Sequence, residues 1–163
     1  MWVLIFSELA VFGAGLAAFM AVRLTDPAGF AAAQSTLMVG MAGVNTIVLV
    51  TSGLFAALAT ISVTKPAARM WLLAASMLGA VFLWLKGVEY AGKSAAGITF
   101  ETHSFFTFYY LLTGFHAAHV VAGIVMLALV GWQAQPRIIQ TGVAFWHMVD
   151  LVWVLLFPVI YLL

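Results

Sequence analysis

Cysteine is absent from this sequence of 163 residues, and charge is scarce. Without cysteine the chain can form no disulfide, no thiolate zinc site and no iron–sulfur cluster. Charged residues make up only 7% of the chain, whereas a soluble domain carries about 25%. The net charge of +1 provides no field that would recruit nucleic acid. Because apolar residues account for 66% of the sequence, the chain is expected to reside in a lipid bilayer.

Five apolar runs are each long enough to cross a bilayer. A hydrocarbon core about 30 Å thick needs about 20 apolar residues of helix, and the runs lack the in–out alternation of barrel strands. Polar segments such as Arg23–Pro27, Lys65–Arg69 and Gln133–Arg137 separate them. The sequence therefore predicts an all-α integral membrane protein, one bundle of five transmembrane helices without a soluble domain. The predicted spans of this single domain, residues 1–163, are 1–22, 35–63, 70–91, 103–132 and 141–163.

The loops predict an orientation. The side that holds the N-terminus collects three basic residues and the other side two, which favours a cytoplasmic N-terminus and an outer C-terminus. These residues are Lys65, Arg69 and Arg137 against Arg23 and Lys93. The first run carries Glu8 and lacks a basic leader, so it is not read as a cleaved signal peptide. It also starts without a polar lead-in, which is compatible with a preceding segment.

Ionisable residues inside the spans form an inner group. A charged residue at a helix centre costs about 2.5–3.5 kcal/mol on insertion scales, so such residues are usually paired or functional. The inner group consists of Glu8, His116, His119, His147 and Asp150. The spacing i,i+3 places both histidines of the fourth span on one helix face, and it does the same for the last two residues. Asn45 and Thr46 are expected near the same depth.

Three interpretations of the inner group remain open. The group is a buried polar network that fixes helix register through mutual hydrogen bonds, or it relays or stores a proton. The third interpretation is a haem or metal site. Two histidines at i,i+3 on one helix cannot sandwich an iron, and no spacing specific for a metal occurs.

A second polar group is expected near the outer end of the third span and in the link that follows. It consists of Lys86, Glu89, Tyr90, Glu101 and His103. Lys86 and Glu89 are i,i+3 neighbours that can neutralise each other, and Glu89 and Lys93 have the favourable i,i+4 order.

Small residues at four-residue spacing predict close helix packing. The pairs are Gly13 and Ala17, Gly40 and Val44, Gly53 and Ala57, and Gly114 and Ala118. Pro158 in the last span predicts a kink.

Two strings in the last two spans resemble subunit III of haem–copper oxidases. Thr113–Val120 reads T-G-F-H-A-A-H-V, and Phe145–Trp153 reads F-W-H-M-V-D-L-V-W. Three further stretches agree in order: Ile5–Glu8, Asn45-Thr46 with Ser52-Gly53, and Glu89-Tyr90. The resemblance covers essentially the whole chain and corresponds to the last five of the family's seven helices. The segment Lys86–Tyr90 is most similar to the NorE-type accessory subunit associated with nitric oxide reductase in denitrifying bacteria.

The resemblance implies a non-catalytic accessory subunit in the bacterial inner membrane. It implies that this chain binds no haem and no metal, and that the partner is a catalytic, haem-containing subunit with non-haem iron or copper. The implied role is to pack on that subunit and to support its stability, assembly or proton uptake. The resemblance also admits a bound phospholipid. Glu8 corresponds to the family's buried glutamate, and the other residues of the inner group correspond to its polar helix residues.

Two alternatives come from other classes of protein. The first is a small haem- or metal-binding membrane oxidoreductase that uses His116, His119 and His147. The second is a proton or ion transporter.

Overall fold

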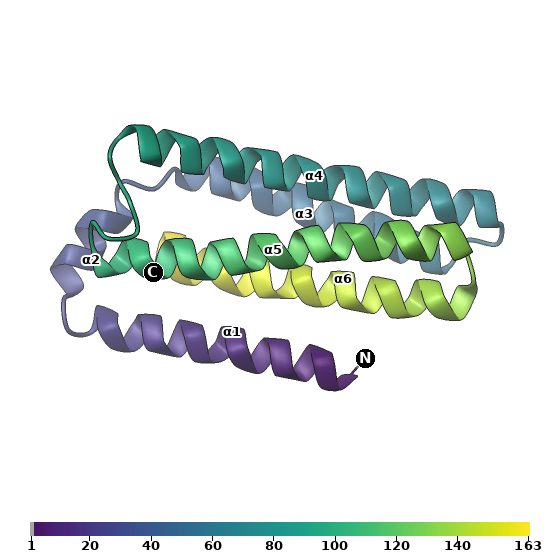
Figure 1. The fold of residues 1–163 in the computed structure, drawn as a ribbon, viewed down its shortest axis with the longest axis horizontal. Helices are drawn as coiled ribbons and strands as arrows, with labels where there is room; N and C mark the ends of the chain where they lie inside the picture. The colour runs from purple at the N-terminus through teal and green to yellow at the C-terminus, as the bar shows by residue number, and fades with distance from the viewer. Residues whose placement is uncertain (1) are drawn as a thin grey trace.

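The computed structural model describes residues 2–163, and all regular structure in this part of the chain is helical (Figure 1). Five helices are long and apolar enough to cross a membrane, so the predicted fold class is confirmed. In order, the elements are α1 (Trp2–Arg23), α2 (Pro27–Gln34), α3 (Val39–Thr60), α4 (Lys65–Ala95), α5 (Ser104–Gln133), α6 (Pro136–Phe157) and the π-helix η1 (Pro158–Leu162).

The helices pack as a four-helix core with α1 on one side (Figure 1). Helices α3 and α4 run side by side, as do α5 and α6, and α6 is the most enclosed of the long helices. Helix α1 buries only Ile5, Phe12 and Phe19. Most of its surface is therefore left for lipid or for another protein chain.

A short helix, α2, begins where the sequence suggested only the end of the first span. Asp26 is its N-cap, since the carboxylate accepts a hydrogen bond of 3.0 Å from the backbone N–H of Gly29. Pro27 occupies the first turn, where its missing N–H is not needed. At the other end of the helix, Gln34 Nε2 donates to the Ile160 carbonyl oxygen at 3.0 Å. Helix α2 thus closes one end of the bundle against η1.

Helix α4 is longer than the predicted span 70–91, because it includes charged residues at both ends. It begins after the N-cap Thr64, whose hydroxyl accepts from the Ala67 N–H at 3.4 Å. With 31 residues it is about 46 Å long, and it therefore exceeds the hydrocarbon core and reaches the interfaces or tilts.

The C-terminal end of the chain winds into a π-helix instead of the expected simple kink. Pro158 has no N–H for the i→i−4 bond, so the α-helical ladder is interrupted there. The Leu163 N–H donates to the Pro158 carbonyl oxygen at 2.9 Å, an i→i−5 bond. This wider turn carries Tyr161, which is buried.

Trp146 joins four helices at the centre of the core. The ring is fully buried, and a Cβ atom built on either Gly79 of α4 or Gly123 of α5 would lie only 2.6 Å from it. Trp146 Nε1 donates to Ser52 Oγ of α3 at 3.1 Å, and that hydroxyl donates to the Ala75 carbonyl oxygen of α4 at 2.7 Å. Glycine is therefore needed where this ring lies between α4 and α5.

The small-residue pairs show the expected close helix packing only in part. Gly53 lies against the Asp150 carboxylate, and a Cβ built on Gly114 would lie 3.9 Å from the Tyr90 hydroxyl. A Cβ built on Gly13 or Gly40 meets nothing within 4 Å. The expectation of close packing is therefore wrong at these two positions, because they face away from the bundle.

Candidate functional site

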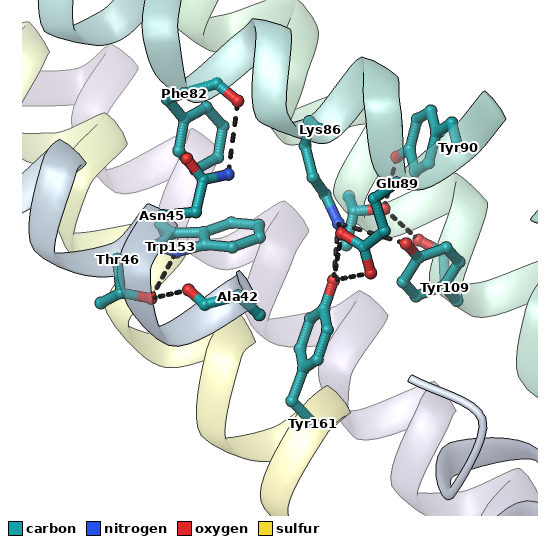
Figure 2. Close-up of polar contacts among 11 residues, drawn as sticks. Ala42, Asn45, Thr46, Phe82, Lys86, Glu89, Tyr90, Tyr109, Trp153 and Tyr161 are labelled. Atoms are coloured by element: carbon teal, nitrogen blue, oxygen red, sulfur yellow. Dashed lines mark hydrogen bonds and ion pairs between the residues drawn. The ribbon is translucent and has the colours of Figure 1, made fainter. Parts of the chain in front are cut away.

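A closed cluster of four polar side chains lies in the interior near the end of the bundle that carries α2. Lys86 Nζ donates to Glu89 Oε2 at 2.8 Å, and both side chains are 3% exposed. The ammonium also donates to the hydroxyl of Tyr161 at 2.6 Å and to that of Tyr109 at 3.3 Å. Figure 2 shows these side chains pointing toward one another from α4, α5 and η1.

The cluster satisfies the polar atoms that would otherwise be expensive in lipid. The Tyr161 hydroxyl donates to Glu89, at 3.0 Å from Oε1 and 3.1 Å from Oε2. The Lys86 ammonium lies over aromatic faces, 4.8 Å from the ring centre of Tyr109, and such contacts favour a cation. A buried ion pair stabilises a fold only when further hydrogen bonds complete it. Here two tyrosines supply them.

Tyr90 belongs to a neighbouring contact between α4 and α5. Its hydroxyl lies 2.5 Å from Thr113 Oγ1, and the threonine hydroxyl donates to the Tyr109 carbonyl oxygen at 2.5 Å. Tyr90 therefore lies beside the Lys86 cluster without hydrogen-bonding to its charged groups (Figure 2).

Glu8 of α1 and His119 of α5 form a pair that shares one proton. His119 Nε2 lies 3.0 Å from Glu8 Oε2, with the side chains 15% and 24% exposed respectively. His119 Nδ1 lies 2.8 Å from the Phe115 carbonyl oxygen. A carbonyl oxygen can only accept, so Nδ1 carries a hydrogen, and the contact with Glu8 needs a second one. The pair is therefore either imidazolium with carboxylate, or neutral imidazole with carboxylic acid.

His147 and Asp150 lie together on α6, facing α3. His147 Nδ1 is 3.7 Å from Asp150 Oδ2, and the histidine side chain is 46% exposed whereas the aspartate is 11% exposed. The carboxylate fits against α3 because Gly53 has no side chain. Asp150 Oδ1 is buried without a hydrogen-bond partner among residues 2–163.

His116 is isolated from the other histidines. It is fully buried, and neither ring nitrogen has a partner within the described chain. Its ring packs 5.1 Å from Trp153 and 5.5 Å from Phe82, centre to centre. Asn45 of α3 donates to the carbonyl oxygen of the same Phe82 at 3.3 Å (Figure 2).

The inner group is thus two pairs and one single ring instead of one hydrogen-bonded network. The reason is helix rotation, since residues three apart differ by about 60° around the axis. His119 faces α1, whereas His116 faces α4 and α6. Thr46 does not hydrogen-bond to a residue of the inner group; its hydroxyl accepts a hydrogen bond from Trp153 Nε1 at 3.0 Å.

The outer group is divided as well. Glu101 is exposed in the link between α4 and α5. His103 caps α5, with Nδ1 accepting from the Phe105 N–H at 3.1 Å, and its Nε2 donates to Asp26 Oδ2 at 3.1 Å. The pKa of Asp26 is held below its ordinary value of 3.8, mainly by the hydrogen bond from the Gly29 N–H and to a lesser extent by the hydrogen bond from His103. The expected pairing of Glu89 with Lys93 does not form an ion pair in the described structure, because Glu89 turns toward Lys86.

No set of three or more His, Asp or Glu side chains in residues 2–163 is placed to hold a metal ion. Glu8 and His119 are two groups that can each bind a proton and lie in direct contact, whereas Lys86 and Glu89 form a buried ion pair.

Tyr109 and Tyr161 were missed by sequence reasoning. A signal for Tyr109 was present, since it lies four residues before Thr113 and seven before His116, on the same helix face. A tyrosine inside an apolar helix needs a hydrogen-bond partner. Tyr161 had no such signal, because its direction depends on the π-helix.

Comparison with known proteins extends over the whole chain. Residues 1–163 match the protein-family model described as "Cytochrome c oxidase subunit III". A protein named "Cytochrome c oxidase subunit 3" from Thermostichus vulcanus is 29% identical, over 99% of this chain and 84% of its own length. "Cytochrome bo(3) ubiquinol oxidase subunit 3" from Pseudomonas putida is 28% identical, over 99% of this chain and 83% of its own length.

A longer relative combines two subunits in its name. "Heme-copper oxidase subunit I+III" from Aeropyrum pernix is 30% identical over 99% of this chain, which spans only 22% of that protein.

Proposed function

This chain belongs to the cytochrome c oxidase subunit III family, and we propose that it is a non-catalytic accessory subunit packed on the catalytic subunit of a haem–copper-type respiratory complex. Members of this family are accessory subunits without an active site of their own. The single observation that carries the choice of partner is the Aeropyrum pernix relative, whose name joins subunit I and subunit III. A subunit fused to subunit III in one protein is the natural partner of a separate chain of the same family.

The apolar surface provides room for such a partner. Helix α1 leaves large side chains exposed, such as Val3 and Phe6 at 84% and 66%. Helices in lipid associate through close packing and interhelical hydrogen bonds and not through hydrophobic transfer. We therefore place the partner's helices against α1, with haem and non-haem iron or copper held by the partner and not by this chain.

Within the family, our proposal is a complex of the nitric oxide reductase type. The support is the segment Lys86–Tyr90, which is similar to NorE-type subunits, and a short oxidase subunit III is the alternative. In this proposal the complex lies in the bacterial inner membrane, with residues 1–163 as one transmembrane unit. Lys65, Arg69 and Arg137 support a cytoplasmic position for the end of the bundle that holds the N-terminus.

A role in proton uptake is the second part of the proposal. Its support is the geometry of Glu8 and His119, a pair that requires one shared proton and is 24% and 15% exposed. The contribution to stability and assembly would come from the buried Lys86 cluster and from Trp146.

The experiment is purification of the tagged chain from native membranes in mild detergent. We expect a haem-containing subunit to co-purify, with nitric oxide consumption in the NorE case and oxygen consumption in the oxidase case. Isolation of a stable, functional chain with no such partner would contradict the proposal. A haem spectrum from the chain alone, or ion flux in vesicles that hold only this chain, would favour the oxidoreductase or the transporter instead.

A further inference from the structure

His103 connects α2 with the beginning of α5, two helices that lie together at one end of the bundle (Figure 1). Its Nδ1 accepts a hydrogen bond of 3.1 Å from the Phe105 N–H in the first turn of α5. Its Nε2 lies 3.1 Å from Oδ2 of Asp26, the N-cap of α2. One imidazole ring therefore contacts the capping groups of two helices.

Both contacts of His103 together require a neutral ring. A backbone N–H can only donate, so Nδ1 must keep its lone pair, and the hydrogen of the neutral ring is then on Nε2, where it faces the carboxylate. An added proton would occupy Nδ1 and place two donors 3.1 Å apart. Protonation therefore breaks the contact with the Phe105 N–H and converts the contact with Asp26 into an ion pair.

The ring of His103 can exchange protons with water. Its side chain is 30% exposed and that of Asp26 is 53% exposed, and His103 precedes the membrane-spanning helix α5. Histidine is the side chain whose ordinary change of charge falls between pH 5 and 8. Asp26 stays a carboxylate in that range, because the pKa of Asp26 lies below its ordinary value of 3.8.

The packing around His103 keeps the ring close to Asp26. From α2, the ring of Phe30 packs against the imidazole at 5.4 Å between centres. A Cβ built on Gly29 would lie 2.9 Å from Nε2 of His103, so glycine leaves the room that the imidazole occupies. The ring can therefore remain beside Asp26 when it loses its contact with α5.

Asp26 is the charged group that pairs with His103 among residues 2–163. The surrounding elements carry three further charged side chains: Arg23 at the end of α1, Lys93 at the end of α4 and Glu101 in the link before α5. Arg23 donates to the Leu163 carbonyl oxygen, Lys93 lies over the ring of Phe106, and Glu101 is exposed. The partial positive charges at the first turns of α2 and α5 oppose a cation, and the Asp26 carboxylate favours it.

We propose that His103 is a pH-sensitive cap of α5: the neutral ring holds the first turn of the helix, and a proton from the aqueous phase transfers the ring to Asp26 alone. Helix α2 keeps its place during this exchange, because Gln34 holds it to the Ile160 carbonyl oxygen of η1 at 3.0 Å. The response is therefore confined to the first turn of α5 and the link before it. This device goes beyond the proposed function and does not depend on which complex the chain joins.

The test measures hydrogen exchange of single backbone amides by NMR, on the full chain in detergent at pH 8 and at pH 5.5. Exchange rates are converted to protection factors, which removes the intrinsic pH dependence of exchange. We expect the protection of the Phe105 amide to fall about fivefold at pH 5.5, the size of effect that loss of a helix cap produces. The Ala67 amide is the internal control, since its hydrogen-bond acceptor is the hydroxyl of Thr64, which does not titrate in this range.

Two variants separate the cap from the ion pair. His103→Asn retains a favourable N-cap that does not titrate, so the Phe105 amide should have the same protection at both pH values. Asp26→Asn removes the carboxylate but keeps an acceptor for the Gly29 N–H. In that variant the loss of protection should need a lower pH than in the wild type, because the imidazolium is no longer paired.

Nitrogen-15 shifts of the His103 ring provide a readout in the wild type that needs no variant. At pH 8 the hydrogen should be on Nε2 alone, and at pH 5.5 both nitrogens should carry one. The proposal is overturned by a hydrogen on Nδ1 at pH 8, by a ring that stays neutral at pH 5.5, or by equal protection of the Phe105 amide in both states of the ring. A fall in protection in His103→Asn as large as that of the wild type would also overturn it.

Discussion

The ammonium nitrogen of Lys86 lies 2.6 Å from the hydroxyl oxygen of Tyr161, a residue 75 positions further along the chain. This contact joins the C-terminal part of α4 to the last turn of the described chain. It also completes the coordination of the buried charge pair, because the same hydroxyl donates to Glu89. The cluster thus ties the C-terminal turn of the described chain to α4.

Removal of one charge from this cluster should strongly destabilise the fold. Lys86→Met leaves Glu89 buried and unpaired, and such a change destabilises a fold by about 3–5 kcal/mol. Lys86→Met combined with Glu89→Gln should recover most of the loss, because no net charge is then buried. The measurement is the thermal unfolding midpoint in detergent, with Lys65→Met as the exposed control. Equal midpoints for the single and double variants would contradict this account.

Gly79 should tolerate no side chain beside Trp146. Gly79→Ala places a Cβ 2.6 Å from the ring, and overpacking of this kind costs about 1–3 kcal/mol. Gly87→Ala on the same helix is the control, since its Cβ would meet nothing within 4 Å. That variant should gain up to about 1 kcal/mol from helix propensity. Thermal midpoints that move in the same direction for both variants would refute the packing argument.

Asp26 should titrate at a lower pH than a free aspartate. The Gly29 N–H and His103 favour the carboxylate, so the folded pKa lies below the ordinary value of 3.8. The stabilisation of α2 is therefore fully present above that value and is lost as the pH falls through the folded pKa. The pKa can be followed through the Asp26 carboxyl carbon by NMR. His103→Phe should raise it partway, and an unchanged titration in that variant would remove the contribution of His103.

Glu8→Gln should test the shared proton. The amide retains the shape of the side chain and can still donate to His119 Nε2, so we expect assembly to be retained while the pH profile of turnover by the intact complex changes. Turnover is measured across pH with Ser7→Ala, one residue away on the same helix, as control. Identical pH profiles for the wild type and Glu8→Gln would end the proton-uptake proposal.

Much of the fold follows from the sequence because lipid allows few solutions. Long apolar runs must be helices, since every backbone group has to be satisfied within the segment. Helix α2 is not among the predicted helices even though Asp26-Pro27 is a helix-start signal, because the same two residues also fit the end of the first span.

Fewer features of the candidate site could be predicted from the sequence. The spacing of Lys86 and Glu89 predicted their pairing, and the structure places Glu89 Oε2 2.8 Å from the Lys86 ammonium. The separation of His116 from His119 could not be predicted, because it depends on which neighbouring helix lies opposite each ring. Lys93 had the correct spacing for Glu89, but competition from Lys86 decides the outcome.

The π-helix Pro158–Leu162 changes the rotational phase of the side chains in the C-terminal turn. A π-turn is equivalent to one inserted residue in an α-helix, so it acts as a phase shift between α6 and its own last residues. In this shifted phase Tyr161 reaches Lys86, and the Ile160 carbonyl reaches Gln34. The position of the hydroxyl that completes the buried charge pair of α4 thus depends on a single-residue change of register at the end of the chain.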